Sequence, residues 1–270
     1  MITIRKYLAI FLISLQERFV YRANFFMMTF VRFIPIVTTI YLWRAVYAAS
    51  DEQEIGSLEY PAMVGYYLLV MVSRAFSSMP QLSSTIAQDI RDGELNKYLI
   101  RPVSYMGFML TTRISHKFVY WMMAAVPYAI VFYHLRDYLL APIGLGTWVA
   151  YACSLLLSML IGFLIATAVG LIGFWYLEIS SLLFVVMSLE YFLSGHMVPL
   201  TVLPERITRI LLYLPFQYEA YFPAMLLMGR IPADRLAMEM CRQVGWVAVL
   251  LLICSVLWKA GLKRYGAYGG

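Results

Sequence analysis

Charged residues are scarce in this chain of 270 residues, in which Asp, Glu, Lys and Arg together make up 13%. Soluble domains usually carry about twice that share, so the composition excludes an ordinary soluble protein. Hydrophobic residues make up 62%, which indicates an integral membrane protein. The formal net charge is +6. In a membrane protein such an excess favours contact with anionic lipid heads, so we expect membrane lipid and not nucleic acid as a partner.

Motifs for catalysis and for metal or nucleotide binding are missing as well. The three histidines, His116, His134 and His196, are scattered, and the patterns HExxH, GxSxG and GxxxxGKS/T do not occur. The three cysteines have no CxxC spacing, which argues against a metal site or a disulfide framework. An intramembrane enzyme would need polar residues clustered at one depth, and the sequence shows no such cluster. We therefore predict no catalytic residues, no metal site and no cofactor in this chain.

Long apolar runs fill most of the sequence. A helix that crosses a bilayer needs about 20 apolar residues. The runs predict six transmembrane helices, at residues 24–47, 60–82, 117–134, 147–175, 179–194 and 243–260. Residues 1–22 instead place apolar and basic side chains on different faces at helical spacing, which predicts an amphipathic helix along the membrane surface. The expected fold class is an all-α integral membrane protein, with one transmembrane domain over residues 23–270.

Basic residues select one orientation for these spans. With the amino terminus inside, most Lys and Arg residues fall in the inner segments, and the acidic residues between the first two spans fall outside. Cytoplasmic loops of membrane proteins carry such an excess of Lys and Arg. We therefore expect both termini in the cytoplasm.

Small residues recur at every fourth position of the 147–175 run. They form a flat stripe on one helix face, against which another helix can pack closely. The spacing favours packing within the chain over packing against a partner. The residues of this stripe are Ser154, Ser158, Gly162, Ala166 and Gly170.

The segment 195–230, before the last span, combines apolar residues with Gly and Pro, which interrupt regular helix. At membrane depth such backbone must be buried in protein or line a cavity, because lipid cannot satisfy its polar groups. The segment predicts short, partly re-entrant outer-leaflet helices that could form a lid over an exit path, and a packed extracellular loop is the alternative. The candidate gate residues are Gly195, His196, Pro199, Pro215 and Phe216.

Among the ionisable residues inside predicted spans, Arg32, Arg74 and Glu190 lie away from the span ends. Such residues are costly in hydrocarbon, so they commonly mark a transport pathway or pair with one another. Both interpretations are open for these three.

Residues 83–104 form a polar block of mixed charge between the second and third spans. Asp89 and Asp92 share one face of a short predicted helix, and Ile86 and Ile90 share another, before a stop near Gly93. A compact charged element of this kind is suited to dock another protein. The candidate docking residues are Asp89, Arg91, Asp92, Glu94, Lys97 and Arg101.

This block resembles the membrane subunits of ABC-2-type export permeases, which carry a pattern like I-R-x-G-x-L-x-x-x-L-x-R-P. The amphipathic first helix, the break at 195–199 followed by Leu-Pro-Phe at 214–216, and the carboxyl-terminal RYGAYGG agree with that family. The resemblance covers essentially the whole chain. Its pattern is matched by Ile90, Arg91, Gly93, Leu95, Leu99, Arg101 and Pro102.

The resemblance implies a permease in the bacterial cytoplasmic membrane that exports a substrate, and the apolar spans suit an amphiphile. Two six-span subunits, identical or similar, would face each other, and two separate ABC ATPase subunits would bind ATP and Mg²⁺ on the cytoplasmic side. The 83–104 block would act as the coupling helix, and the surface helix would brace the same ATPase. The alternative is a secondary transporter or channel that uses Arg32, Arg74 and Glu190 as an ion or proton path.

Overall fold

The computed structural model describes residues 2–20, 31, 33–50, 53–139, 144–176 and 178–265. Most of these residues are helical. Within them, the only strands are β1 (Glu54–Ile55) and β2 (Leu58–Glu59), which pair antiparallel with Glu54 opposite Glu59. The hairpin turns at Gly56 and Ser57, which both have positive φ.

The chain divides into two compact units. The first contains Met1–Tyr41 and Glu94–Arg136, and the second contains Leu42–Gly93 and Asp137–Gly270. Helix α3 (Ile34–Ala49) belongs to the first unit up to Tyr41 and to the second unit from Leu42. The short turn η1 (Arg136–Tyr138) passes from the first unit to the second.

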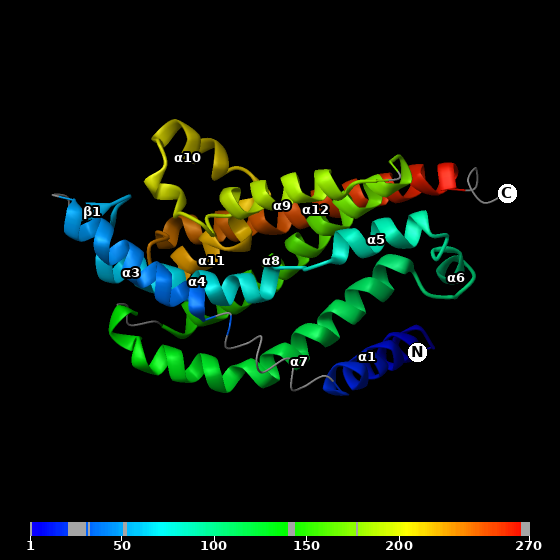
Figure 1. Ribbon diagram of the computed structural model, residues 1–270, viewed down its shortest axis with the longest axis horizontal. Helices are drawn as coiled ribbons and strands as arrows, with labels where there is room; N and C mark the ends of the chain where they lie inside the picture. The colour runs from blue at the N-terminus through cyan, green and yellow to red at the C-terminus, as the bar shows by residue number, and fades with distance from the viewer. Residues whose placement is uncertain are drawn as a thin grey trace. The chain divides into compact units, whose positions relative to one another are not determined.

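The first unit is built on α1 (Ile2–Val20), which packs along α7 (Tyr105–His134), with the short α6 (Asn96–Leu99) before α7 (Figure 1). Ser104 caps α7, since its Oγ accepts a hydrogen bond from the Gly107 N–H at 2.9 Å. The rings of Phe11 and Phe118 meet edge to face, 6.0 Å between centroids. Other apolar side chains of α1 stay exposed: Ile4, Leu8, Leu12 and Ile13.

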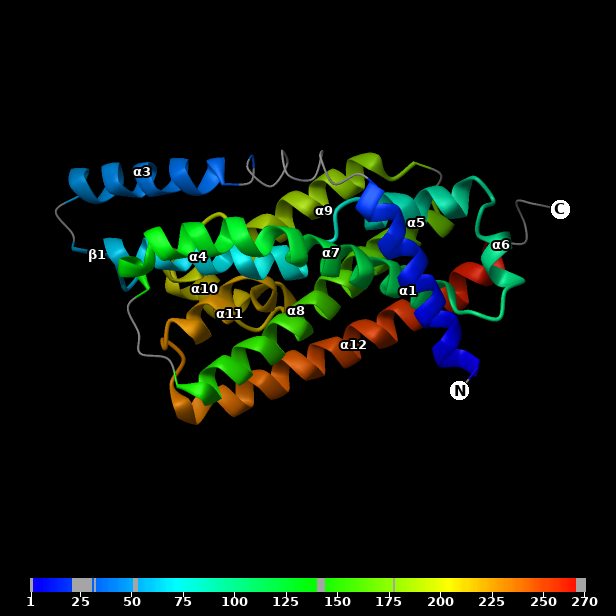
Figure 2. The ribbon, with the colours of Figure 1, turned by 90° about the horizontal axis from the view of Figure 1, so that it is seen from below.

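The second unit is built around α8 (Leu145–Leu171), which contacts α4 (Tyr60–Ser77), α5 (Leu82–Arg91) and α12 (Ala233–Tyr265). Figure 2 shows α12 alongside α8 over most of its length. The two helices run parallel, because Gln243 donates to the Ser154 carbonyl near one end and Cys254 to the Leu164 carbonyl further on. A short turn, η2 (Ile172–Phe174), follows α8.

The small residues of α8 lie against other parts of the second unit. A Cβ on Gly162 would overlap the Ser77 carbonyl, and one on Gly170 would lie 2.8 Å from the Ile86 Cβ. The Ala166 carbonyl accepts a hydrogen bond from Ser83 at 2.8 Å. The absence of larger side chains therefore lets α4 and α5 approach the α8 backbone.

The predicted broken segment folds as four short elements after α9 (Ser180–Leu193). They are η3 (Leu200–Val202), α10 (Glu205–Leu211), η4 (Pro215–Glu219) and α11 (Tyr221–Leu227). All of α11 is buried, whereas most of α10 is exposed. The segment thus has an outer part and a part that returns into the unit, where α11 packs on α4 and α8.

Among the described residues, three stretches are long and apolar enough to cross a membrane: Tyr60–Arg91, Leu145–Phe174 and Ala233–Tyr265. Two shorter apolar helices, Ile34–Ala49 and Ser180–Leu193, coincide with predicted spans, and α7 overlaps another. The prediction of an all-α membrane protein is confirmed. The count of six spans stays a prediction, because only three stretches within the described ranges have the length and composition of a crossing.

Candidate functional site

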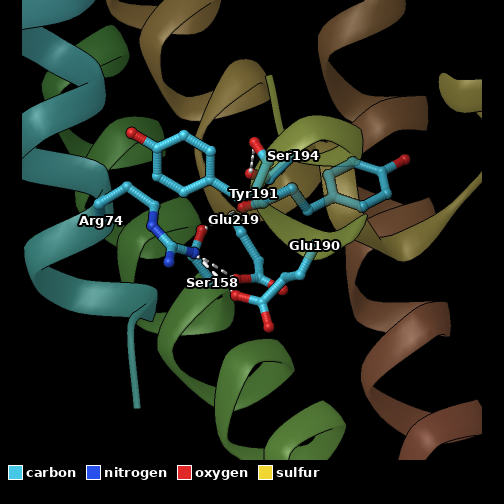
Figure 3. A network of polar contacts seen from close by, with 7 residues as sticks. Arg74, Ser158, Glu190, Tyr191, Ser194 and Glu219 are labelled. Atoms are coloured by element: carbon cyan, nitrogen blue, oxygen red, sulfur yellow. Dashed lines mark hydrogen bonds and ion pairs between the residues drawn. The ribbon is translucent and has the colours of Figure 1, made fainter. Parts of the chain in front are cut away.

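A buried ion cluster joins α4, α9 and η4 in the second unit. Near the end of α4, Arg74 directs its guanidinium toward two carboxylates (Figure 3). The same nitrogen, Nη1, lies 2.9 Å from Glu190 Oε1 on α9 and 3.1 Å from Glu219 Oε2 on η4. We call these three residues the Arg74 triad.

The triad is largely shielded from solvent. The side chain of Glu219 is 0% exposed, and those of Arg74 and Glu190 are 19% and 18% exposed. A charge buried in an apolar environment is costly unless it is paired and hydrogen-bonded. Arg74 therefore holds both α9 and η4 against α4.

Further hydrogen bonds fix η4 to α8 and α12. The Ser158 hydroxyl donates to the Tyr218 carbonyl at 2.5 Å, and the Tyr218 hydroxyl donates to Glu239 Oε2 on α12 at 2.9 Å. Glu239 also binds Arg242 at 2.6 Å. Through Tyr218 and Glu219, η4 thus contacts α8, α12 and α4, and Arg74 connects it to α9.

Sequence reasoning placed Arg74 and Glu190 as a pathway or an internal pair, and the structure brings these two together. Arg32, the third residue of that prediction, lies outside the described residues. Glu219 was missed, because it falls in a segment that the sequence marks as aromatic and broken. The available signal was a single carboxylate inside the apolar stretch Phe216 to Phe222, where an unpaired charge would be costly.

The predicted gate residues pack beside α4. Gly195 has φ +76°, and a Cβ there would lie 2.8 Å from the Tyr66 hydroxyl, so only glycine fits this position. The Tyr66 hydroxyl donates to the Gly195 carbonyl at 2.5 Å, and the His196 ring lies 4.2 Å from the ring of Tyr191. Pro199 and Pro215 are buried at the starts of η3 and η4, and Phe216 is partly buried.

Replacing Tyr66 with phenylalanine should lower the free energy of unfolding by about 1 kcal/mol, because the buried Gly195 carbonyl loses its donor. The measurement is the thermal unfolding midpoint in detergent micelles. Tyr213→Phe is the matched control, since the Tyr213 side chain is 61% exposed, and we expect no shift there. Equal midpoints for the two variants would show that this hydrogen bond does not hold the segment.

The polar block at residues 83–104 begins with α5, which has one buried and one charged face. Leu82, Ile86 and Ile90 are buried against α8 and η2. Asp89 is half-buried on the other side, and Arg91 and Asp92 are exposed. The helix ends at Arg91, shortly before Gly93 at φ +75°. The charged face of α5 is therefore accessible to a partner, while its apolar face forms part of the core.

Arg91 connects the end of α5 to the start of α9. Its Nε donates to Asp92 Oδ1 at 3.0 Å, and its Nη1 lies 3.8 Å from Glu178 Oε2. The hydrogen bond from Arg91 lowers the pKa of Asp92, and hydrogen bonds from Ser180 lower the pKa of Glu178. Both carboxylates therefore stay ionised at neutral pH. The exposed ion pairs of Arg91 with Asp92 and Glu178 contribute little to the stability of the fold. A partner could therefore bind these charged groups at little cost in stability.

The remaining residues of the block lie in the first unit. Lys97 forms an ion pair with Glu94, and the Arg101 guanidinium lies 5.8 Å from the centre of the Tyr98 ring. Lys97 and Arg101 are exposed. The six predicted docking residues are thus divided between the two units after Gly93.

Comparison with known families identifies the class of this protein. The profile described as ABC-2 family transporter protein matches residues 33–269. The chain therefore belongs to the ABC-2 family of transporter proteins, as the polar block at residues 83–104 and the carboxyl-terminal motif predict. A search of curated proteins found no match. Family membership and the apolar helices together define a membrane-embedded transport permease.

Proposed function

We propose that this chain is the permease subunit of an ATP-driven exporter in the bacterial cytoplasmic membrane. Two such subunits, identical or similar, form one translocation pathway, and each crosses the membrane six times with both termini in the cytoplasm. Separate ABC ATPase subunits bind and hydrolyse ATP with Mg²⁺, so this chain is not itself an enzyme. Membership of the ABC-2 family supports this assignment.

The observation that carries the proposal is the packing of α5. Its charged face is open, while its apolar face contacts α8 and η2 directly. The Cα and Cβ of Ala87 lie only 3.1 and 3.2 Å from where a Cβ on Gly173 would be, so α5 and η2 approach each other closely at this glycine. A close-packed interior transmits displacement. A push on the charged face by an ATPase would therefore move α8, and through η2 it would reach α12.

The other predicted segments take parts in the same scheme. Residues 83–104 receive the ATPase, and the surface helix within 1–22 braces it. The broken segment 195–230 covers the outer end of the pathway, with Gly195, His196, Pro199, Pro215 and Phe216 at its gate. The exposed apolar faces of α1 and α9 suit an amphiphilic substrate and the lipid around it.

Charge reversal on the cytoplasmic block tests this function. The variant Asp89→Lys, Arg91→Glu, Glu94→Lys would be purified in complex with its neighbouring ATPase. We expect loss of substrate-stimulated ATP hydrolysis with unchanged membrane insertion, because the ATPase would face inverted charges on α5 and on the segment that follows it. Unchanged stimulation would exclude a coupling role for this block.

A second ion pair provides the matched control. Glu205 and Arg209 form an exposed pair on α10 at 2.6 Å, far from α5 within the second unit (Figure 1). Exchanging these two charges should leave ATP hydrolysis unchanged. A secondary transporter or channel would behave differently, since the isolated chain in liposomes would then move substrate along an ion gradient without any ATPase.

A further inference from the structure

A small cavity lies where three helical elements of the second unit end. Its walls include Arg91 at the end of α5, Phe174 at the end of η2 and Tyr265 at the end of α12. The same three residues end the three apolar stretches that are long enough to cross a membrane. Figure 1 shows α5 and α12 ending on the same side of the second unit, and η2 contacts both helices. We call this cavity the Arg91 pocket.

The length of these stretches gives the depth of the pocket in a membrane. Leu145–Phe174 has 30 residues and Ala233–Tyr265 has 33, which correspond to about 45–50 Å of helix at 1.5 Å per residue. A bilayer with its headgroup regions is about 40–45 Å thick. Helices of this length extend from one headgroup region to the other. The Arg91 pocket, where they end together, therefore lies at the level of the lipid headgroups.

Aromatic side chains form most of the pocket wall. Trp175, Tyr176 and Tyr265 line it together with Phe174, whose ring meets those of Trp175 and Tyr265 edge to face. Tyr176 is 63% exposed. Trp and Tyr are enriched where a membrane meets water, because their rings are apolar and their polar groups remain hydrated. The wall thus has the composition of a membrane interface.

Basic groups accompany these rings. The Arg91 side chain is 45% exposed, and the last turn of α12 adds Lys263 and Arg264, which are both exposed. Among the described residues that line the pocket, none is acidic. The ion pairs of Arg91 with Asp92 and Glu178 are exposed and therefore weak. A guanidinium has five N–H donors and binds phosphate oxygens in a forked geometry, so Arg91 can bind a phosphate beside these carboxylates.

The size of the pocket limits what can occupy it. Its volume is about 50 Å³, whereas pockets for drug-sized ligands have about 300–1,000 Å³. It fits a single small polar group and not a whole transported molecule. An exposed apolar surface begins beside it, because α9 starts shortly after Tyr176 and exposes Leu182, Phe184 and Val185. A ligand with a small polar group and long apolar chains matches both features.

We propose that the Arg91 pocket binds the phosphate group of a membrane phospholipid. Arg91 donates to the phosphate oxygens, the rings of Trp175 and Tyr176 pack against the glycerol part, and the acyl chains lie along α9. Basic pockets at the ends of membrane-spanning helices are suited to lipid headgroups. Headgroup depth and the adjoining apolar helix favour a lipid over a soluble phosphate compound and over a side chain of the ATPase.

Native mass spectrometry of the delipidated full-length chain in detergent micelles tests the proposal, with dioleoyl phosphatidylglycerol as the added lipid. We expect the wild type to bind one molecule with a saturable signal. Arg91→Ala should weaken this binding about tenfold, because the charge-assisted hydrogen bonds to the phosphate are lost. Dioleoylglycerol has the same acyl chains without the phosphate, so it should bind the wild type no better than the phospholipid binds Arg91→Ala.

Arg209→Ala is the matched control, because Arg209 is also an exposed arginine in an ion pair but lies on α10. This variant should bind the phospholipid as the wild type does. Equal binding by the wild type and Arg91→Ala would overturn the proposal and leave the pocket to a side chain of the ATPase. Displacement of the lipid by an equal concentration of glycerol 3-phosphate would also overturn it, since the site would then be one for soluble phosphate compounds. The titration uses the chain without an ATPase, so its outcome is independent of the proposed function.

Discussion

Replacing Arg74 with alanine should lower the free energy of unfolding by about 3–5 kcal/mol, the usual cost of removing one partner from a buried ion pair. The variant leaves Glu190 and the wholly buried Glu219 with no positive partner in the triad. The loss would reach beyond α4, because η4 and α9 are held through the same guanidinium. Thermal and denaturant unfolding in detergent micelles measures the effect.

Arg242→Ala is the control for this experiment. Arg242 forms a similar ion pair, 2.6 Å from Glu239, but its side chain is 37% exposed. Partly exposed pairs contribute about 0–1 kcal/mol, so this variant should unfold close to the wild type. If both alanine variants lose the same stability, burial of the triad does not determine its contribution. The Arg74 triad would then not anchor the segment 195–230.

The positions of the helices could be predicted from the sequence, because hydrophobic periodicity is a local property. The polar block at residues 83–104 shows this best: Ile86 and Ile90 share the buried face of α5, as their spacing predicts. The first and last residues of the helices could be predicted less well. Hydropathy marks only the part of a helix that suits lipid, whereas α7 begins at Tyr105 and α12 at Ala233, well before the apolar runs at 117–134 and 243–260.

The triad could be predicted only in part, because tertiary packing decides it. Arg74 and Glu190 stand out as charges within apolar runs. Glu219 lies 145 positions from Arg74 in the sequence, and only the return of η4 into the second unit brings it there. No local pattern indicates that return, since Gly and Pro show where a helix stops but not where the chain goes next.

The β1–β2 hairpin was also not predicted. Its strands have two residues each, too few for an alternating pattern. The hairpin depends on the positive φ of Gly56 and Ser57 and on packing beside η3, where a Cβ on Gly56 would lie 2.8 Å from the Val202 nitrogen. The close approach of Gly56 to η3 depends on tertiary packing, so it could not be predicted from the sequence.

Gly162→Leu should cost about 3 kcal/mol of stability, the upper part of the usual range for overpacking. The first carbon of any side chain at Gly162 would overlap the carbonyl of Ser77 at the end of α4. Backbone cannot move aside as a flexible side chain can, so α4 and α8 must separate. Because α4 carries Arg74, the same displacement would weaken the triad.

Gly245→Leu is the matched control in the interior of α12. No described atom lies within 4 Å of a Cβ placed at Gly245. Leucine has a higher helix propensity than glycine, so the free energy of unfolding of this variant should rise by about 0.5–1 kcal/mol. Thermal midpoints in detergent should therefore move in opposite directions for the two variants. A shift of the same sign in both would mean that helix propensity, and not the close contact between α4 and α8, determines the effect at Gly162.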